Sequence, residues 1–336
     1  MRVVCEKIIR HSYFNFKMKP LILDEISKEI YKVLEESCNS CTSNLISLSG
    51  GLDSSIIAYF LKQRKPKTIS VIAEDFVSTD LTYCQMISKE MQLPLSIYNV
   101  KTATILEAVE ETIKILKNFN DIEIRNNVVM YLAMKWAKEN DEKSIITGDG
   151  ADELFAGYKF LINKPENELE EEIKRICAVM HFPTQKIGSS LGIKVESPFL
   201  NENMIQLAEK IPVNLKVKNE NEKRYGKWIL RKTFEKHIPK QIAWREKSPM
   251  QDGAGTAGLT NLFNSIIEEV VFVEKKLIAE KEDNVVIRNR ESMHYYEIFK
   301  KFYGSPVEKE AKTICPYCKH KVENSKFCRM CGAFPI

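Results

Sequence analysis

Two glycine-rich stretches hold the residues whose types and spacing suit catalysis. The first, residues 47–55 (SLSGGLDSS), places two glycines, four serines and a carboxylate between two apolar runs. Small residues between a strand and a helix let backbone N–H groups and hydroxyls point at one spot, which makes an anion cradle. The lysine that ends the usual nucleotide-binding loop is missing, and Asp53 would repel phosphate. A divalent cation held by Asp53 and bridging to phosphate oxygens removes this conflict.

The second stretch, residues 147–158 (TGDGADELFAGY), has three carboxylates within five positions, namely Asp149, Asp152 and Glu153. Close carboxylates repel one another unless cations share them. We therefore expect Mg²⁺ to lie between Asp53 and Asp152. The alternative interpretation is an ordinary helix N-terminus, because Asp and Glu are favoured in the first turn of a helix.

Regular elements must position these two stretches. A helix is predicted at residues 21–37, and strands then alternate with helices. The strands are predicted at residues 44–48, 67–74, 95–100 and 143–148, and the helices at 53–63, 81–92, 104–117 and about 124–140. This alternation predicts an α/β fold with a parallel sheet covered by helices on both faces. Ligands of such sheets bind at the carboxyl ends of the strands, where both glycine-rich stretches emerge.

The second half of the chain is predicted to be mainly helical. Apolar residues recur at helical spacing from about residue 165 to 300, including residues 223–239 and 258–277, which predicts a helical lobe packed on the sheet. The charged residues 166–172 indicate a solvated helix face. Residues 304–313 (GSPVEKEAKT) are typical of a linker.

Two cysteine pairs near the end of the sequence have the spacing of metal ligands. Cys315 and Cys318 form one CxxC pair, and Cys328 and Cys331 form another after nine intervening residues. This spacing is typical of a zinc ribbon, a closed site that is structural and not catalytic. A redox pair or iron are the alternatives. A tail of roughly 25 residues buries too little core to fold alone, so we expect the metal to supply its folding free energy.

The tail and the N-terminal region carry two less specific signals. Five basic residues give the tail a positive charge: Lys319, His320, Lys321, Lys326 and Arg329. Such a surface suits contact with RNA or a protein, or is simply solvated. Cys38 and Cys41 form a lone pair before the first strand. Chance spacing near a helix end is favoured there over a metal or redox role.

The composition limits the class of protein. The 336 residues carry a formal net charge of +4, which does not by itself indicate nucleic-acid binding. No apolar run approaches the ~20 residues needed to span a bilayer. Nine cysteines in a chain of this length do not indicate a secreted disulfide scaffold. We expect a cytoplasmic protein with reduced thiols.

Three stretches together resemble the synthetase domain of asparagine synthetase, in the family's order and at plausible intervals. They are SGGLDSS (49–55), TGDGADELFAGY (147–158) and YGKWILRKTFEKHIPKQIAWREKSPMQDGAG (225–255). Two smaller stretches agree, at residues 123–135 and 291–303. The glycine loop alone is shared by all ATP pyrophosphatases of the PP-loop type, whereas the combination is highly specific.

This resemblance implies a division of the chain into four parts. In chain order these are an N-terminal segment (1–24), the ATP pyrophosphatase domain (25–303, with the sheet core at about 44–160 and the helical lobe at about 161–303), a linker (304–313) and the zinc ribbon (314–336).

The resemblance also implies the chemistry. The family binds ATP with its pyrophosphate in the first loop, and the side-chain carboxylate of aspartate attacks the α-phosphate. Pyrophosphate leaves, and ammonia then displaces AMP from the β-aspartyl-AMP intermediate. Cations matter because negative charge gathers on the phosphates as the bond to pyrophosphate breaks.

Site residues carry over from the family by motif. The residues implied to hold pyrophosphate are Ser49, Gly50, Gly51, Asp53, Ser54 and Ser55. Those implied to meet adenosine, largely through backbone atoms, are Leu48, Ala73, Thr147 and Gly148. Asp53 and Asp152 would hold Mg²⁺. Lys247, in AWREK, matches a family lysine that neutralises the phosphates and the intermediate, and so would replace the lysine missing from the first loop.

Departures from the family pattern bear on the substrate. Asp149 stands where the family usually has glutamate, a group linked to forming the intermediate and handling the incoming amine. Its carboxylate would reach about 1.5 Å less far. Lys194 and Glu196 stand where the family has glutamate and arginine, and Glu74 replaces a glycine. Reversed charges would alter which amino acid fits nearby, so another carboxylate is the alternative to aspartate.

Glutamine-using relatives begin with a glutaminase domain whose N-terminal cysteine is the nucleophile. Here Arg2 follows Met1, Cys5 suits a small apolar role, and too few residues precede Ser49 for such a domain. We therefore expect the nitrogen to come from free ammonia or from a separate glutaminase subunit.

Two other classes of protein are weighed against this hypothesis. A PP-loop enzyme acting on tRNA, such as a thiolase, also combines an SGG-type loop with cysteine pairs and zinc-binding ends. Such an enzyme has no need of residues 148–158 or 243–255. The second class, a non-catalytic binding protein that kept the ATP fold, conflicts with the intact first loop, Asp152 and Lys247.

Overall fold

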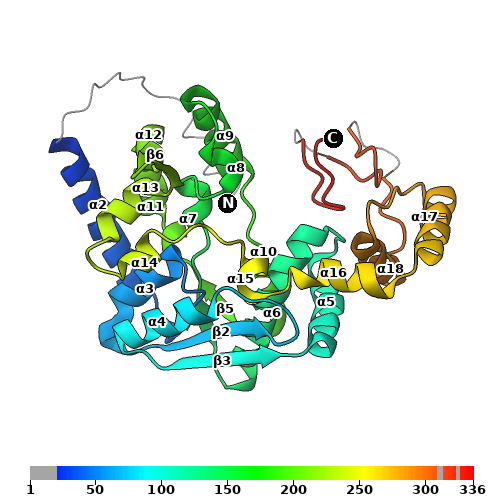
Figure 1. The fold of residues 1–336 in the computed structure, drawn as a ribbon, viewed down its shortest axis with the longest axis horizontal. Coiled ribbons are helices and arrows are strands. Elements are labelled where there is room, and N and C mark those ends of the chain that lie inside the picture. Colours follow the sequence, from blue (N-terminus) through cyan, green and yellow to red (C-terminus); the bar gives the residue numbers. More distant parts are fainter. Residues whose placement is uncertain (1–20, 309–312, 323–325) are drawn as a thin grey trace.

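Five parallel strands form a central sheet in the computed structural model, which describes residues 21–308, 313–322 and 326–336 (Figure 1). The strand order is β3-β2-β1-β4-β5, and every pairing in it is parallel. The strands are β1 (Leu45–Ser47), β2 (Lys67–Ala73), β3 (Leu95–Val100), β4 (Ser144–Ile146) and β5 (Lys194–Glu196). The predicted α/β fold is confirmed. Predictions for residues 1–20, which include Arg2 and Cys5, and for 309–312 of the linker lie outside the described residues.

The central strands are predictable because they are buried on both faces. Leu45 and Ile46 of β1 are fully buried, and in β2 every residue after Lys67 is buried. Such strands are continuous apolar runs in the sequence. The pattern does not reveal β5, because this edge strand has only three residues, and Lys194 and Glu196 are two of them. Charged residues on an edge strand also discourage pairing with another chain.

Helices cover both faces of the sheet and build two separate cores. Leu45 and Ile145 belong to the first core, and Ile46 and Ile146 to the second, because successive side chains of a strand point to opposite faces. The main helices of the first core are α5 (Thr102–Leu116), α6 (Asp121–Glu139) and α18 (Arg290–Tyr303). Those of the second are α2 (Leu21–Ser40), α3 (Leu52–Leu61), α4 (Leu81–Met91), α11 (Glu202–Lys210) and α13 (Trp228–Phe234).

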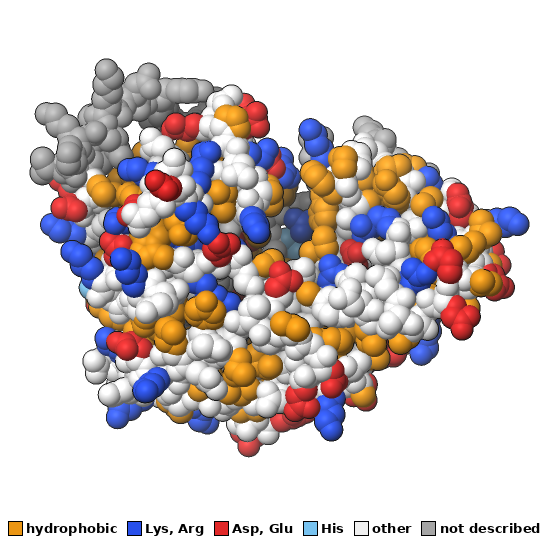
Figure 2. Space-filling model, viewed as in Figure 1, with side chains coloured by type: hydrophobic (Ala, Val, Ile, Leu, Met, Phe, Trp, Pro, Cys, Tyr) orange, Lys and Arg blue, Asp and Glu red, His pale blue; other side chains and the backbone are white. Residues whose placement is uncertain are grey.

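The second half of the chain is mainly helical, as predicted. Its other helices are α7 (Ala151–Leu154), α8 (Lys159–Ile162), α9 (Glu166–Val179), α10 (Pro183–Leu191), α12 (Val213–Lys216), α14 (Lys240–Ala243), α15 (Met250–Ala254), α16 (Gly258–Ile266) and α17 (Glu269–Asp283). The predicted solvated face on α9 is confirmed, since Glu166, Glu168 and Glu170 are exposed. Figure 2 shows a deep hollow between the part of the molecule that contains α8 and α9 and the part that contains α16, α18 and the C-terminal tail.

One predicted helix is wrong in its first half. Residues 223–226 form strand β7 (Lys223–Gly226), which pairs antiparallel with β6 (Val217–Glu220), and α13 begins only at Trp228. Asn221 and Glu222 both have positive φ, 49° and 65°, which is the backbone twist that joins two strands in a tight hairpin. Four-residue strands carry too little alternation to be recognised in the sequence.

A second predicted helix is divided into two. The helical periodicity of residues 258–277 belongs to α16 and α17, and the chain is extended at Ile267 and Glu268 between them. The break turns α17 onto a different path, so the two helices do not present one continuous apolar face.

The cysteine-rich tail packs against the sheet domain. The amide of Phe119 donates to the carbonyl of Met330 (2.9 Å). Arg288 donates both to Asp121 at the start of α6 (2.8 Å) and to the carbonyl of Cys331 (2.7 Å). The tail therefore rests on the α5–α6 and α17–α18 connections. No helix in the described part of the chain is long and apolar enough to cross a membrane.

Candidate active site and cysteine cluster

The first glycine-rich stretch joins β1 to α3 and has the geometry of an anion cradle. Gly50 has a φ of +61°, and a Cβ on it would lie 2.5 Å from the backbone of Tyr83, so this position requires glycine. The hydroxyls of Ser49 and Ser54 lie 3.2 Å apart. Ser55 is fully buried, and its hydroxyl has no hydrogen-bond partner within the described ranges. Its unused hydroxyl fits a loop built to receive an anion.

The second glycine-rich stretch joins β4 to α7 and touches the first. Gly150 has a φ of +97°, and a Cβ there would lie 2.4 Å from the side chain of Leu200. A Cβ on Gly148 would lie 3.0 Å from the Cβ of Asp53. The two loops therefore meet at the edge of the sheet, where the parallel strands β1 and β4 end.

Two carboxylates and two ammonium groups gather where the loops meet. Nζ of Lys227 lies 2.5 Å from Oδ2 of Asp53 and 2.6 Å from Oδ1 of Asp152. Nζ of Lys247 lies 2.7 Å from Oδ2 of Asp152. The formal charges of the four groups cancel, which reduces the cost of burying them. Asp53 and Asp152 thus converge on one point, although they belong to different loops.

Lys227 is the residue of this cluster that the sequence analysis misses. It has a φ of +55°, and its amide donates to the carbonyl of Phe155 (3.0 Å). In a predicted helix over residues 223–239, nothing distinguishes this lysine from ordinary surface lysines. Gly226 is the signal that could reveal it, because a Cβ at Gly226 would lie 2.2 Å from the carbonyl oxygen of Ala156. The hairpin must therefore approach the second loop closely.

Asp152 and Lys247 hold their charges at neutral pH. Burial would raise the pKa of Asp152, but Lys227 and Lys247 outweigh it and hold the pKa below its ordinary value. Burial would likewise lower the pKa of Lys247, but Asp152 and Asp53 raise it above its ordinary value. Asp152 therefore stays ionised and Lys247 keeps its proton.

Arg245, also in AWREK, fixes the segment that carries Lys247. One guanidinium nitrogen lies 2.7 Å from Oδ1 of Asp80, and the other donates to the carbonyls of Ser49 and Gly50, each at 3.3 Å. The first loop and the segment around Lys247 are therefore tied together. The sequence analysis misses this role, because it depends on contacts between distant parts of the chain.

Asp149 lies in the second loop and is held by hydroxyls. Its Oδ2 accepts hydrogen bonds from Thr147 (2.9 Å) and from Thr184 on α10 (2.5 Å). Burial raises the pKa of Asp149, and the two threonine hydrogen bonds oppose that shift. The structure thus places the shorter carboxylate next to the predicted site and fixes its orientation from a second element.

The residues predicted to meet adenosine lie at the ends of strands. The amide of Leu48 donates to Ile69 (2.9 Å) and that of Thr147 to Glu196 (2.9 Å), so both amides are already used within the sheet. Ala73 is buried at the end of β2. Contact with adenosine at these positions stays a prediction, and carbonyl groups are the part of the backbone with acceptor capacity left.

The charge reversal at β5 has an explanation within the protein. Nζ of Lys194 lies 2.6 Å from Oε1 of Glu196. The Glu196 carboxylate also accepts hydrogen bonds from the amides of Thr42 (2.9 Å) and Ser43 (2.8 Å). The two reversed charges therefore neutralise each other and anchor the segment before β1. Glu74, the other departure, is exposed at the end of β2.

The carboxylates present fit a magnesium ion. Oδ1 of Asp53 is buried and has no hydrogen-bond partner among the residues that the structure describes. Together with Asp152 it offers carboxylate oxygens from two loops, and such oxygens are the ligands that Mg²⁺ prefers.

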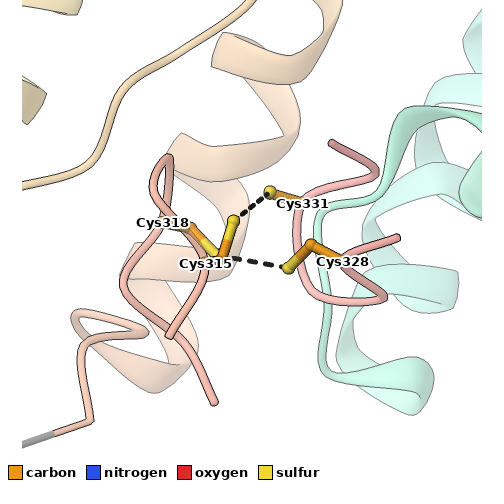
Figure 3. Close-up of side chains that lie close together, drawn as sticks. All are labelled: Cys315, Cys318, Cys328 and Cys331. Atoms are coloured by element: carbon orange, nitrogen blue, oxygen red, sulfur yellow. Dashed lines mark hydrogen bonds between the residues drawn. The ribbon is translucent and has the colours of Figure 1, made fainter. Parts of the chain in front are cut away.

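The four cysteines of the tail form one compact cluster (Figure 3). All four sulfurs lie within 4.8 Å of one another, with Cys315 and Cys331 3.7 Å apart and Cys318 and Cys328 3.6 Å apart. Tetrahedral zinc with Zn–S bonds of ~2.3 Å separates its sulfurs by about 3.8 Å. The cluster is buried and therefore fits a single tetrahedral ion in a closed site.

The other cysteine pair has a different environment. Cys38 is buried at the end of α2, and Cys41 donates to the carbonyl of Ser37 (3.5 Å). Burial raises the pKa of Cys41 to about 11. Thiols in this condition are poor nucleophiles, which favours packing over a redox role.

Most of the sequence is similar to that of known proteins. The family model described as asparagine synthase matches residues 30–188 and 165–313. A probable glutamine-hydrolysing asparagine synthetase of Dictyostelium discoideum is 27% identical over 252 residues, 67% of this chain and 45% of that protein. Asparagine synthetase B of Escherichia coli K12 is 26% identical over 305 residues, 83% of this chain and 54% of that protein.

The chain spans about half the length of the curated relatives that it matches. Among solved structures, NMN synthetase from Francisella tularensis has a TM-score of 0.36 at 15% identity, covering 84% of this chain and 94% of its own. A U34-tRNA thiolase from Methanococcus maripaludis has a TM-score of 0.28 at 14% identity, covering 76% and 83%. Likeness at this level says nothing of substrate or partner. The family model matches most of the sequence, and the chain belongs to the asparagine synthase family.

Proposed function

We propose that the protein is an ATP-dependent, amide-forming ligase that releases AMP and pyrophosphate. The favoured product is asparagine, formed from aspartate through β-aspartyl-AMP. The observation that carries the proposal is the convergence of Asp53 and Asp152 on Lys227, with Lys247 beside them. Two loops bring carboxylates to this point and two other segments bring lysines, which together suit a metal-bound triphosphate.

The residues of the first loop would bind the pyrophosphate part of ATP. The donors of this loop are the amides of the Gly50–Gly51 turn and the hydroxyls of Ser49, Ser54 and Ser55, of which the Gly51 amide now donates to Oγ of Ser49 (3.3 Å). Mg²⁺ bound by Asp53 and Asp152 would neutralise the phosphates as pyrophosphate leaves. Magnesium would take up the two carboxylates, so both lysines would be free to interact with phosphate oxygens.

Lys247 and Lys227 would then stabilise the charge that develops on the α-phosphate and the leaving pyrophosphate. The removal of one preorganised charge donor of this kind costs ~10²–10³ in rate in well-studied enzymes. Asp149 would handle the incoming amine, and Thr184 would hold its carboxylate in place. Arg245 ties the segment of Lys247 to the first loop, and the amide of Lys227 donates to the carbonyl of Phe155 in the second, so both lysines are held in place as precise positioning requires.

The nitrogen source and the tail complete the proposal. We infer that free ammonia, or ammonia from a separate glutaminase subunit, displaces AMP. The four-cysteine cluster would hold a structural Zn²⁺, and the basic surface of the ribbon is a candidate contact for RNA or a protein. We place the protein in the cytoplasm, where thiols stay reduced and available to zinc.

Pyrophosphate release tests the reaction directly. The chain would be incubated with ATP, Mg²⁺, aspartate and ammonia, and AMP, ADP, pyrophosphate and asparagine would be measured. We expect AMP, pyrophosphate and asparagine in equal amounts, with loss of all three in Asp53→Ala. ADP formation would contradict the proposal, and so would activity with glutamine alone from the purified chain.

Two outcomes would redirect the proposal to its alternatives. Pyrophosphate release that needs a different carboxylic acid would indicate a synthetase-like amidotransferase on that substrate. Tight tRNA binding with steep salt dependence, and AMP formation only in the presence of tRNA, would indicate a PP-loop tRNA-modifying enzyme. A screen across amino acids, amines and total tRNA separates these cases in one experiment.

A further inference from the structure

Helix α17 exposes most of its apolar residues to solvent, which is unusual for a surface helix of a monomeric protein. The exposed apolar residues are Val270, Val271, Val273, Leu277 and Ile278, each between 38% and 75% exposed. Ala279 is the one residue of this helix that is buried, and Phe272 packs partly against the first core. A surface helix normally turns its apolar stripe inward. Here most of that stripe faces outward.

The exposed apolar residues share one face. At about 100° per residue, Val270, Val273 and Leu277 form one row and Val271 and Ile278 a second row beside it. The two rows together lie roughly opposite Ala279. Figure 1 shows α17 at the outer end of the molecule, away from α3 and α7. We call these five residues the α17 face. Five large apolar residues exposed on one helix face mark a candidate interaction site.

Two opposite charges lie in the middle of the α17 face. Glu274 and Lys281 are exposed, about two helical turns apart, between the two apolar rows. No ion pair within the described part of the chain involves either residue, whereas Lys275 on the inward side pairs with Glu297 (2.6 Å). The midpoint between Glu274 and Lys281 falls between Leu277 and Ile278.

This spacing makes the face complementary to itself. Two copies of α17 packed antiparallel, with a two-fold axis between Leu277 and Ile278, would place each Glu274 opposite Lys281 of the other copy. The apolar rows would cover one another around these two ion pairs. A parallel arrangement would set Glu274 against Glu274 and Lys281 against Lys281, which is repulsive. A two-fold axis through one self-complementary patch is the commonest interface in homo-oligomers.

We propose that the α17 face is a homodimer interface in which two copies of this chain pair antiparallel through α17. Charged residues within an apolar helix seam set the register and orientation of pairing, and here they specify one orientation. Because a single pair of helices buries less than the ~1,200 Å² of a standard interface, we expect a dissociation constant in about the micromolar range. The proposal does not depend on which reaction the enzyme catalyses.

Sedimentation velocity of the full chain, loaded with zinc, tests the interface by charge exchange. Glu274→Lys and Lys281→Glu should each weaken dimerisation at least about tenfold, because each creates two like-charge contacts in a dimer. The double variant should restore the dissociation constant to within about threefold of the original. An equimolar mixture of the two single variants should also dimerise, since their charges are complementary.

Matched variants separate this interface from a general effect of charge or folding. Glu90→Lys makes the same charge change on α4 and should leave dimerisation unchanged, whereas Leu277→Asp should give a monomer. Thermal melting and pyrophosphate release should be unchanged in all of these variants. A chain that is monomeric at about 100 µM would overturn the proposal. So would a dimer indifferent to the single variants, a double variant that fails to restore pairing, or a face occupied only by a different protein.

Discussion

Nζ of Lys227 lies 2.5 Å from Oδ2 of Asp53, although 174 positions separate the two residues in the sequence. The hairpin of β6 and β7 and the left-handed backbone of Lys227 deliver this ammonium to the first loop. Asp152 from the second loop completes the contact at 2.6 Å. Without a cation at this point, two part-buried carboxylates from different loops would repel one another.

Replacement of Lys227 by alanine should therefore affect both stability and rate. We expect pyrophosphate release to fall by ~10²–10³. Without Mg²⁺, the variant should lose about 3 kcal/mol of unfolding free energy, since one partner of a buried ion pair is removed. Saturating Mg²⁺ should recover part of that loss. Lys223→Ala, on the same hairpin but half-exposed, is the control and should change neither quantity. Near-normal turnover of Lys227→Ala would contradict the proposed role.

Thr184 should act on the reaction through Asp149. Thr184→Val removes one of the two hydroxyls that bind Oδ2 of Asp149, and a hydrogen bond to a charged group contributes about 1.5 kcal/mol. We expect the amide-forming rate to fall about tenfold while the KM for ATP stays unchanged. Thr184→Ser keeps the hydroxyl and should recover most of the rate. Equal losses in the valine and serine variants would show that packing, and not the hydroxyl, is what matters.

The zinc ribbon should stabilise the domain on which it packs. Arg288 binds Asp121 at the start of α6 and the carbonyl of Cys331 in the cluster, so the metal-bound fold of the tail supports the α5–α6 connection. Purified protein should contain one zinc per chain. Removal of the metal, or Cys328→Ser, should lower the melting temperature by about 5 °C or more. Cys41→Ser should leave the zinc content unchanged, and one-to-one zinc in Cys328→Ser would contradict the assigned ligand set.

The sequence reveals those parts of the fold and site whose causes are local. Buried strands are apolar runs, and the glycines of the two loops meet local backbone demands such as the positive φ of Gly50 and Gly150. Spacing within one short segment also identifies the four-cysteine cluster. These features are therefore predictable from neighbouring residues alone.

The parts that the sequence hides depend on contacts between distant segments. Lys227 becomes a site residue only because a hairpin of two four-residue strands carries it to Asp53. Arg245 acts through the carbonyls of a loop almost two hundred positions away. Strand β5 exists because β4 offers it a parallel edge, not because its own residues favour a strand. The periodicity of apolar residues within one segment contains no information on contacts between distant segments.

Glu196 gives the stability of the fold a defined pH dependence. Burial alone would raise its pKa, but Lys194 and the hydrogen bonds from Ser43 and Thr42 hold the pKa below its ordinary value near 4.5. A carboxyl group whose pKa is lower in the folded state stabilises the fold above its unfolded pKa. That contribution is lost as the pH falls through the lowered folded value. At pH 7, Glu196→Gln should therefore reduce the unfolding free energy by about 1–2 kcal/mol.

The same comparison at acidic pH separates charge from shape. Chemical denaturation between pH 7 and pH 3 should measure the difference in unfolding free energy between the original chain and Glu196→Gln. This difference should shrink below about pH 4.5, because a protonated carboxyl group, like the amide of glutamine, has no negative charge. Glu29→Gln, which replaces an exposed glutamate in the middle of α2, should show no difference at any pH. If the Glu196→Gln difference were constant across this range, the carboxylate charge would not be what anchors Thr42 and Ser43 to β5.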